Sequence, residues 1–189
     1  PYAFPAFLAT LVWKGMLNTD FGFINQVFLG GAHVPWLDNG LLAKLSILGV
    51  NLWLGFPYMF LVCLGALQSL PGDIEEAAKI DGASGLRTVW SIKLPLVLQS
   101  TVPLLIASFA FNFNNFSLIY MLTGGGPNYP GLSVPVGESD ILISMVYKIA
   151  IDSGSPNYGL ASAMSIVIFV VVGVIAWLGF RQTKTLEEL

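Results

Sequence analysis

Three long stretches without a single charged side chain decide what this chain can fold into. They cover residues 45–72, 94–137 and 153–180. A helix needs about 20 mostly apolar residues to cross the hydrocarbon core of a bilayer, and each stretch supplies at least that many. Composition agrees, because 55% of the residues are hydrophobic and only 10% are charged, whereas soluble domains are about 25% charged. The expected fold is therefore an all-α membrane protein, a polytopic bundle of transmembrane helices.

Breaks in the apolar pattern divide the chain into segments. Pro71-Gly72 ends one apolar run and Thr123-Gly124-Gly125-Gly126-Pro127 ends the next, because glycine and proline punctuate helices. The chain opens on Pro1-Tyr2 inside an uncharged run that is too short to span alone. We therefore interpret residues 1–189 as the C-terminal part of one transmembrane domain, with about three full spans and part of a fourth. The expected segments are about 1–17 (partial), 41–70, 94–122 and 156–180.

The basic residues predict the orientation. Five of the eight lie either in the charged insert at 71–93 or near the C-terminus: Lys79, Arg87, Lys93, Arg181 and Lys184. Loops on the cytoplasmic side of a membrane carry an excess of lysine and arginine. We therefore expect the insert and the C-terminus to be cytoplasmic, and the connections around 18–40 and 123–154 to lie on the opposite side.

The charged insert itself predicts two short helices. Asp73 is placed to cap the first helix by accepting from the amide of Glu76, and acidic residues suit a helix N-terminus. Ala77 and Ala78 are good helix formers that leave a low surface for close approach. Gly82 permits a bend that a side chain would obstruct. A second helix over about 86–92 is expected to end where Pro95 opens the next span.

The spacing of residues in this insert follows a recognisable pattern: Glu76-Ala77-Ala78, three residues, Gly82, nine residues, Ile92, one residue, Leu94-Pro95. It resembles the coupling loop of permease subunits in ATP-binding-cassette (ABC) importers. The resemblance implies a cytoplasmic helix that docks in a cleft of a separate ATPase. The alternative is an ordinary helix–turn–helix connection in which Glu76 only caps. The docking residues that the resemblance implies are Glu76, Ala77, Ala78, Gly82, Ile92, Leu94 and Pro95.

Polar side chains form one stripe on each of the two spans that flank the insert. Asn51, Gly55 and Tyr58 share one helix face, and so do Ser108, Phe111, Asn112 and Asn115. Polar groups inside a membrane mark either a pathway or contacts between helices, which contribute about 0.6 kcal/mol each. Both interpretations remain open. Because neither stripe carries a charge and each pairs amides with an aromatic ring, the pathway interpretation favours a neutral substrate rich in hydroxyls.

A more specific resemblance covers nearly the whole chain. The strings over 51–59 and 108–116, with Leu122-Thr123-Gly124-Gly125-Gly126-Pro127, resemble carbohydrate-type permeases, especially the larger permease of maltose/maltodextrin importers. The resemblance implies that one set of residues borders a sugar site near the middle of the membrane. These residues are Tyr2, Asn51, Leu54, Gly55, Tyr58, Phe111, Asn112 and Asn115.

The resemblance also implies a function. It describes a non-catalytic permease subunit in the bacterial inner membrane that moves maltose- or maltodextrin-like sugars. It implies a second related permease, an ATPase dimer that uses ATP and magnesium, and a periplasmic or extracellular sugar-binding protein, with no cofactor or metal held by this chain. Another neutral oligosaccharide or a polyol is the alternative cargo. An intramembrane enzyme is disfavoured because the apolar segments lack a Ser–His pair, paired Asp residues or His-Glu-x-x-His. A net charge of −3 gives no reason to expect nucleic acid.

Overall fold

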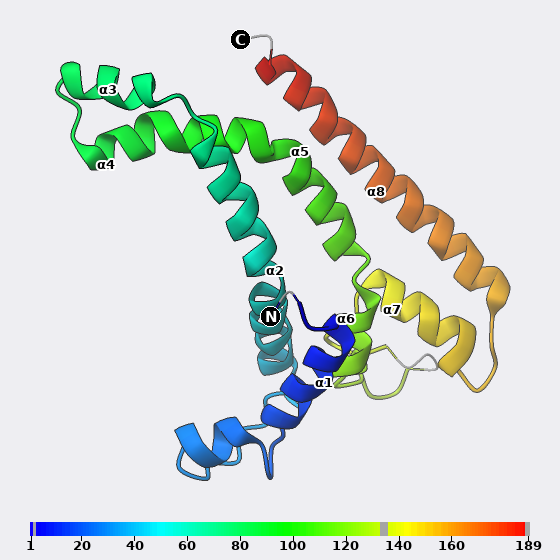
Figure 1. Cartoon of the computed structure of the whole chain (residues 1–189). Helices are drawn as coiled ribbons and strands as arrows, with labels where there is room; N and C mark the ends of the chain where they lie inside the picture. Colours follow the sequence, from blue (N-terminus) through cyan, green and yellow to red (C-terminus); the bar gives the residue numbers. More distant parts are fainter. Residues whose placement is uncertain (2, 133–135, 188–189) are drawn as a thin grey trace. The chain divides into compact units, whose positions relative to one another are not determined.

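The computed structural model describes residues 1, 3–132 and 136–187, with side chains described up to Arg181 (Figure 1). Within this part of the chain, the only extended pairing outside helices is one antiparallel bridge between Asn128 and Gly137. The all-α class is therefore confirmed. The α-helices and the π-helical turns (η) are α1 Ala6–Met16, η1 Ile24–Phe28, α2 Gly40–Gln68, α3 Gly72–Ile80, α4 Gly85–Thr88, η2 Val89–Lys93, α5 Leu94–Phe113, α6 Phe116–Leu122, α7 Leu142–Tyr147, η3 Lys148–Asp152 and α8 Tyr158–Glu187.

Three helices of the described chain are long and apolar enough to cross a membrane. They are Gly40–Gln68, Gly85–Phe113 and Tyr158–Arg181, and α1 is a shorter apolar helix. At most 11% of the most apolar window of each span is buried inside the chain. Such surfaces need lipid or neighbouring subunits, because apolar patches of this size are not left in water.

The predicted span over 94–122 is wrong at one point, because it consists of two helices. α5 ends at Phe113 and α6 begins at Phe116. Asn115 leaves the helical conformation, with φ −76° and ψ 69°, and its side chain accepts a hydrogen bond from the backbone N–H of Leu118. The asparagine side chain thus caps α6, which is why the chain can break here without leaving that amide unsatisfied.

The second helix of the insert also differs from the prediction. It does not end before Pro95: α4, η2 and α5 run on as one helix over Gly85–Phe113. A proline inside a helix lacks a donor, and its ring crowds the carbonyl of the residue four positions earlier, here Ser91. The π turn η2 at Val89–Lys93 lies over that position, and extra-wide turns of this kind accommodate such disruptions.

The chain folds as two compact units. The core unit comprises Pro1–Phe56 and Phe111–Val172, and the loop unit comprises Pro57–Ala110 and Gly173–Leu189. In the core unit α1 packs against α6 (Figure 1). One buried cluster of the core unit joins α2 and α6 to the residue that follows α1: Leu17, Ile47, Val50, Leu118, Ile119 and Leu122. A second joins α7 and η3 to α8: Val146, Ile149, Ala161 and Ile168.

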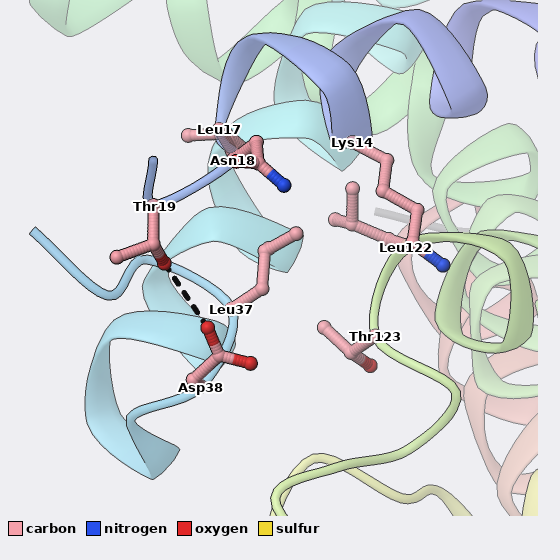
Figure 2. Close-up of a pocket in the computed structure, with 8 residues that line it drawn as sticks. All are labelled: Lys14, Leu17, Asn18, Thr19, Leu37, Asp38, Leu122 and Thr123. Carbon is pink, nitrogen blue, oxygen red and sulfur yellow. Dashed lines mark hydrogen bonds between the residues drawn. The ribbon is translucent and has the colours of Figure 1, made fainter. Parts of the chain in front are cut away.

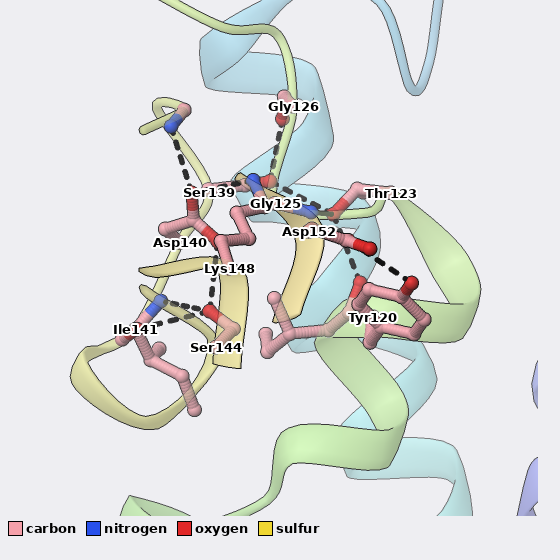
Figure 3. Close-up of polar contacts among 12 residues, drawn as sticks. Tyr120, Thr123, Gly125, Gly126, Ser139, Asp140, Ile141, Ser144, Lys148 and Asp152 are labelled. Atoms are coloured by element: carbon pink, nitrogen blue, oxygen red, sulfur yellow. Dashed lines mark hydrogen bonds and ion pairs between the residues drawn. The ribbon is translucent and has the colours of Figure 1, made fainter. Parts of the chain in front are cut away.

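The described part of the segment between α6 and α8, residues 123–132 and 136–157, belongs to the core unit. Its centre is a buried ion pair in which Lys148 Nζ lies 2.7 Å from Asp140 Oδ2 (Figure 3). Phe116, Tyr120 and Tyr147 form a ring cluster with centroids 4.7–5.0 Å apart. Glycine and proline content predicts only an irregular loop here. The polar and aromatic contacts make it a defined structure.

Candidate functional site

The structure brings three of the predicted site residues together in the core unit. Asn51 Nδ2 on α2 donates to Asn112 Oδ1 on α5 at 2.9 Å. Asn115 Nδ2, at the break between α5 and α6, donates to Asn51 Oδ1 at 3.4 Å. We call Asn51, Asn112 and Asn115 the amide cluster. Two separate stripes in the sequence therefore meet as one uncharged polar site between apolar helices.

The amide cluster supports two chemical roles. Each primary amide has two donor hydrogens and an acceptor oxygen, so the three side chains can satisfy one another and hold α2 to the α5–α6 junction. The same donors and acceptors match sugar hydroxyls. Because a hydroxyl can both donate and accept, a sugar can replace an amide–amide bond without leaving either group unpaired. Contacts between helices and sugar binding are therefore compatible in one site.

The other five residues expected at the site do not share one environment. Leu54 is partly buried and packs against the buried cluster that includes Ile47 and Val50. Gly55 has open space where a Cβ would stand. The side chain of Phe111 is 72% exposed. Tyr58 belongs to the loop unit, and Tyr2 lies outside the described residues.

The charged insert is held together by one carboxylate that the sequence reasoning did not single out. Glu75 Oε2 lies 2.6 Å from Lys93 Nζ, and its Oε1 lies 3.3 Å from Lys79 Nζ. The hydrogen bond from Lys93, and then that from Lys79, lower the pKa of Glu75 from its ordinary value of 4.5. Glu75 thus ties α3 to the start of the following span. The signal for this pairing was present in the i, i+4 spacing of Glu75 and Lys79.

The residues expected to dock on an ATPase divide by exposure. Glu76 and Ala77 are exposed, but Ala78 is only 3% exposed and packs inside the chain. The expected bend is confirmed, because Gly82 has φ +74°. Ile92 and Leu94 are half-buried and Pro95 is exposed. The predicted cap is wrong: α3 begins at Gly72 after Pro71 and has no side-chain cap, so Asp73 lies within the first turn.

Three apolar side chains on the insert were missed by the sequence reasoning. Ile80 is 86% exposed, Leu86 is 76% exposed and Trp90 is 67% exposed. The sequence signal was their place inside a charged segment, where large apolar side chains need a partner. Together with the exposed Glu76 and Ala77, these side chains are the set of exposed residues that we call the insert face.

A cavity of about 250 Å³ opens elsewhere in the core unit, where the chain leaves α1 (Figure 2). Its wall combines a lysine with a carboxylate, and Thr19 Oγ1 donates to Asp38 Oδ2 at 3.1 Å. The buried Leu17 and Leu122 and the partly buried Leu37 form its apolar part. The cavity does not include the amide cluster. Its lining residues are Lys14, Leu17, Asn18, Thr19, Leu37, Asp38, Leu122 and Thr123.

Comparison with known proteins identifies the family. The family described as "Binding-protein-dependent transport system inner membrane component" matches residues 1–184. The chain belongs to this family. As a member of this family with three helices long and apolar enough to cross a membrane, it is a multi-pass inner-membrane protein.

The chain is similar to several proteins named maltose/maltodextrin transport system permease protein MalF. It is 48% identical over 191 residues to that of Vibrio parahaemolyticus, covering 100% of this chain and 36% of the relative. It is 43% identical over 187 residues to that of Yersinia pestis, covering 97% of this chain and 35% of the relative. The chain thus spans about a third of the length of these curated relatives.

Solved structures support the fold of this chain. A crystal structure of a bacterial ABC transporter involved in the import of the acidic polysaccharide alginate matches with a TM-score of 0.82 at 20% identity. The match covers 98% of this chain and 62% of that chain. A second structure of the alginate transporter, with its alginate pentasaccharide-bound periplasmic protein, matches with the same TM-score. At this identity the likeness concerns the fold.

Proposed function

We propose that the permease forms part of the path by which an ABC importer moves maltose- or maltodextrin-like sugars across the inner membrane. The amide cluster is the observation that carries this proposal. It places three uncharged hydrogen-bonding side chains between otherwise apolar helices. A neutral site of this kind suits a neutral sugar. Relatives that are 48% identical and are named for maltose and maltodextrin transport support the choice of cargo.

Sugar binding would proceed by exchange of hydrogen bonds. Hydroxyls replace the bonds from Asn51 to Asn112 and from Asn115 to Asn51, so the amides remain paired before and after the sugar arrives. The exposed ring of Phe111, next to Asn112 in the chain, offers an apolar face for sugar C–H groups. The site then opens alternately to the two sides of the membrane, as transporter sites near the bilayer midplane do.

The energy for this movement would come from a partner. In the proposal the insert face docks on a cytoplasmic ATPase dimer, which binds ATP and magnesium while this chain binds neither and catalyses no reaction. The ion pairs of Glu75 with Lys93 and Lys79 support this role, because they stiffen the link between α3 and the next span. The C-terminus lies on the same cytoplasmic side. A second related permease and a soluble sugar-binding protein complete the transporter.

The proposal is tested with the full-length protein, purified with its partner subunits and reconstituted in liposomes. ATP hydrolysis is measured with binding protein and glucans of increasing length. Asn112→Ala should abolish sugar-stimulated hydrolysis and uptake while the sugar affinity of the binding protein stays unchanged. Asn112 is the cleanest position because, unlike Asn115, it does not cap a helix.

Ser117→Ala provides the matched control, since it removes an exposed polar group from α6, close to the amide cluster in the chain. Normal uptake is expected from this variant. Normal uptake by Asn112→Ala as well would refute the sugar site and leave the amide cluster as a contact between helices. Glu76→Lys tests the ATPase contact separately: hydrolysis should continue without uptake.

A further inference from the structure

The connection between α1 and α2 contains a short amphipathic turn whose polar side faces inwards. Asn25, the second residue of η1, is 0% exposed. Phe21 and Phe28 on either side of it are each 72% exposed. In water the reverse arrangement is expected, with the amide outside and the rings inside. The inversion indicates that the outer side of this turn does not face bulk water.

Asn25 fixes the turn from inside. Its Nδ2 donates to the backbone carbonyls of Thr19 and Val34 at 3.0 Å each and to that of Asn18 at 3.4 Å. Its Oδ1 accepts from Trp36 Nε1 at 2.8 Å. The side chain thus joins both ends of the connection. The exposed rings therefore lie on a turn that these hydrogen bonds hold in one conformation.

The outer side carries five exposed apolar side chains and one exposed amide, Gln26, whose Nε2 donates to the backbone carbonyl of Asp20 at 2.7 Å. The rings of Phe23 and Phe28 meet edge to face with centroids 5.7 Å apart. Val27 and Leu29 are exposed beside them. We call this surface the aromatic face, and its members are Phe21, Phe23, Val27, Phe28 and Leu29.

Contacts inside the core unit hold the aromatic face beside the first two turns of α2. Trp36, which holds Asn25, accepts at its backbone carbonyl from Ser46 Oγ in the second turn of α2, at 3.3 Å. Ile24 packs against the buried cluster that includes Ile47. Charged groups lie close by in the chain: Lys44 is 3.7 Å from Glu138 and half exposed. The turn therefore lies where the membrane-spanning helix α2 begins and its charges end.

We propose that the aromatic face inserts into the interfacial region of the lipid bilayer at this end of α2. Aromatic residues are enriched at the boundary between headgroups and hydrocarbon, and a face that is apolar outside and polar inside matches that environment. The first turns of the span are apolar on the outside as well, since Leu41, Leu45 and Leu48 share one exposed side of α2. The turn would fix the depth of α2 in the membrane. This inference holds whatever the permease transports.

Spin labels test the proposal in the full-length protein, reconstituted with its partner subunits in nanodiscs of phosphatidylethanolamine and phosphatidylglycerol. Cys63, the single cysteine of these 189 residues, is first replaced in Cys63→Ala, together with any cysteine elsewhere in the full-length protein and its partner subunits. A nitroxide is then attached in Phe28→Cys. His33→Cys is the matched control, because His33 lies in the same connection, is 65% exposed and pairs with Asp20. Collisions with oxygen, which concentrates in hydrocarbon, and with a water-soluble nickel chelate are measured at each label.

The oxygen-to-nickel collision ratio should be several-fold higher at position 28 than at position 33. Equal and high nickel accessibility at both positions would place the aromatic face in water and overturn the proposal. Protection from both agents at position 28 would also overturn it, because a protein partner would then cover the face. A Phe21→Cys label should repeat the result for Phe28→Cys, and a water-exposed label there would contradict insertion of the aromatic face as a whole.

Discussion

Breaking the ion pair between Asp140 and Lys148 should open the segment between α6 and α8. The two side chains are only 4% and 6% exposed, and their charged atoms are 2.7 Å apart. Asp140 also accepts from the backbone N–H of Gly137 at 2.7 Å and from Ser144 Oγ at 2.8 Å (Figure 3). Lys148→Met would leave the carboxylate buried with these two neutral donors alone.

The expected loss of local stability follows from the burial of the ion pair and from the two hydrogen bonds that Asp140 keeps. Removing one partner of a buried ion pair costs about 3–5 kcal/mol. Because two donors still face Asp140, we expect about 3 kcal/mol for Lys148→Met, near the lower end of that range. The double variant with Asp140→Asn removes both charges, and such neutral replacements often cost about 1 kcal/mol or less. The double variant should therefore be about 2 kcal/mol more stable than Lys148→Met, although it carries one substitution more.

Hydrogen exchange of the α7 amides in the reconstituted protein measures this local stability. A loss of about 3 kcal/mol corresponds to exchange about 150-fold faster, and the double variant should exchange at most about tenfold faster than the parent. Lys44→Met is the matched control, because its partner Glu138 is 3.7 Å away and both side chains are well exposed. Exposed pairs contribute about 0–1 kcal/mol. If the double variant exchanged as fast as Lys148→Met, the buried carboxylate would not be the cause and the reasoning would fail.

Three further predictions concern single residues. Asn25→Ala should destabilise the connection between α1 and α2 by about 3 kcal/mol, since it strands the Trp36 N–H and removes three further bonds; unchanged exchange of the η1 amides would contradict this. The lowered pKa of Glu75 means that its ion pairs stabilise α3 at pH values above the ordinary 4.5 and are lost as the pH falls below 4.5. A spin label in Ala77→Cys should therefore become mobile in acid. In the Lys93→Met variant this pH dependence should shrink. Gly82→Val should impair coupling of ATP hydrolysis to uptake more than Gly82→Asn, because φ +74° suits asparagine better than a β-branched residue; equal loss in both would point to a close contact at Gly82 instead of backbone strain.

The spans could be predicted from the sequence because one physical quantity, the length of an uncharged apolar run, decides them. Apolarity does not report where a helix breaks inside such a run. The break before α6 depends on a single side chain, Asn115, which replaces a backbone partner. The passage of a helix through Pro95 depends on a π turn upstream. Both are local hydrogen-bonding choices that leave the hydropathy pattern unchanged.

The candidate site, too, could be predicted from the sequence only in part. Helical spacing was enough to place Asn51 on one face and Asn112 on another, and these faces meet. Spacing could not tell which side of the insert helix turns inwards, because alanine suits both a buried and an exposed position. Ala78 is buried, whereas Ile80, two residues later, is 86% exposed. The exposed apolar side chains on the insert thus follow from packing within the loop unit and not from the motif.

Asn115 shows how the helix break and the amide cluster belong to one feature. Its Oδ1 accepts from the N–H of Leu118 and caps α6, while its Nδ2 donates to Asn51. The two functions use different atoms of one amide. A hydroxyl that replaces Asn51 as acceptor therefore leaves the cap in place, and α6 need not unwind when the cluster exchanges partners. A continuous helix would have had no free backbone N–H to cap at this point. The break therefore allows the Asn115 side chain to be held in place through its oxygen, while its Nδ2 can change hydrogen-bond partner.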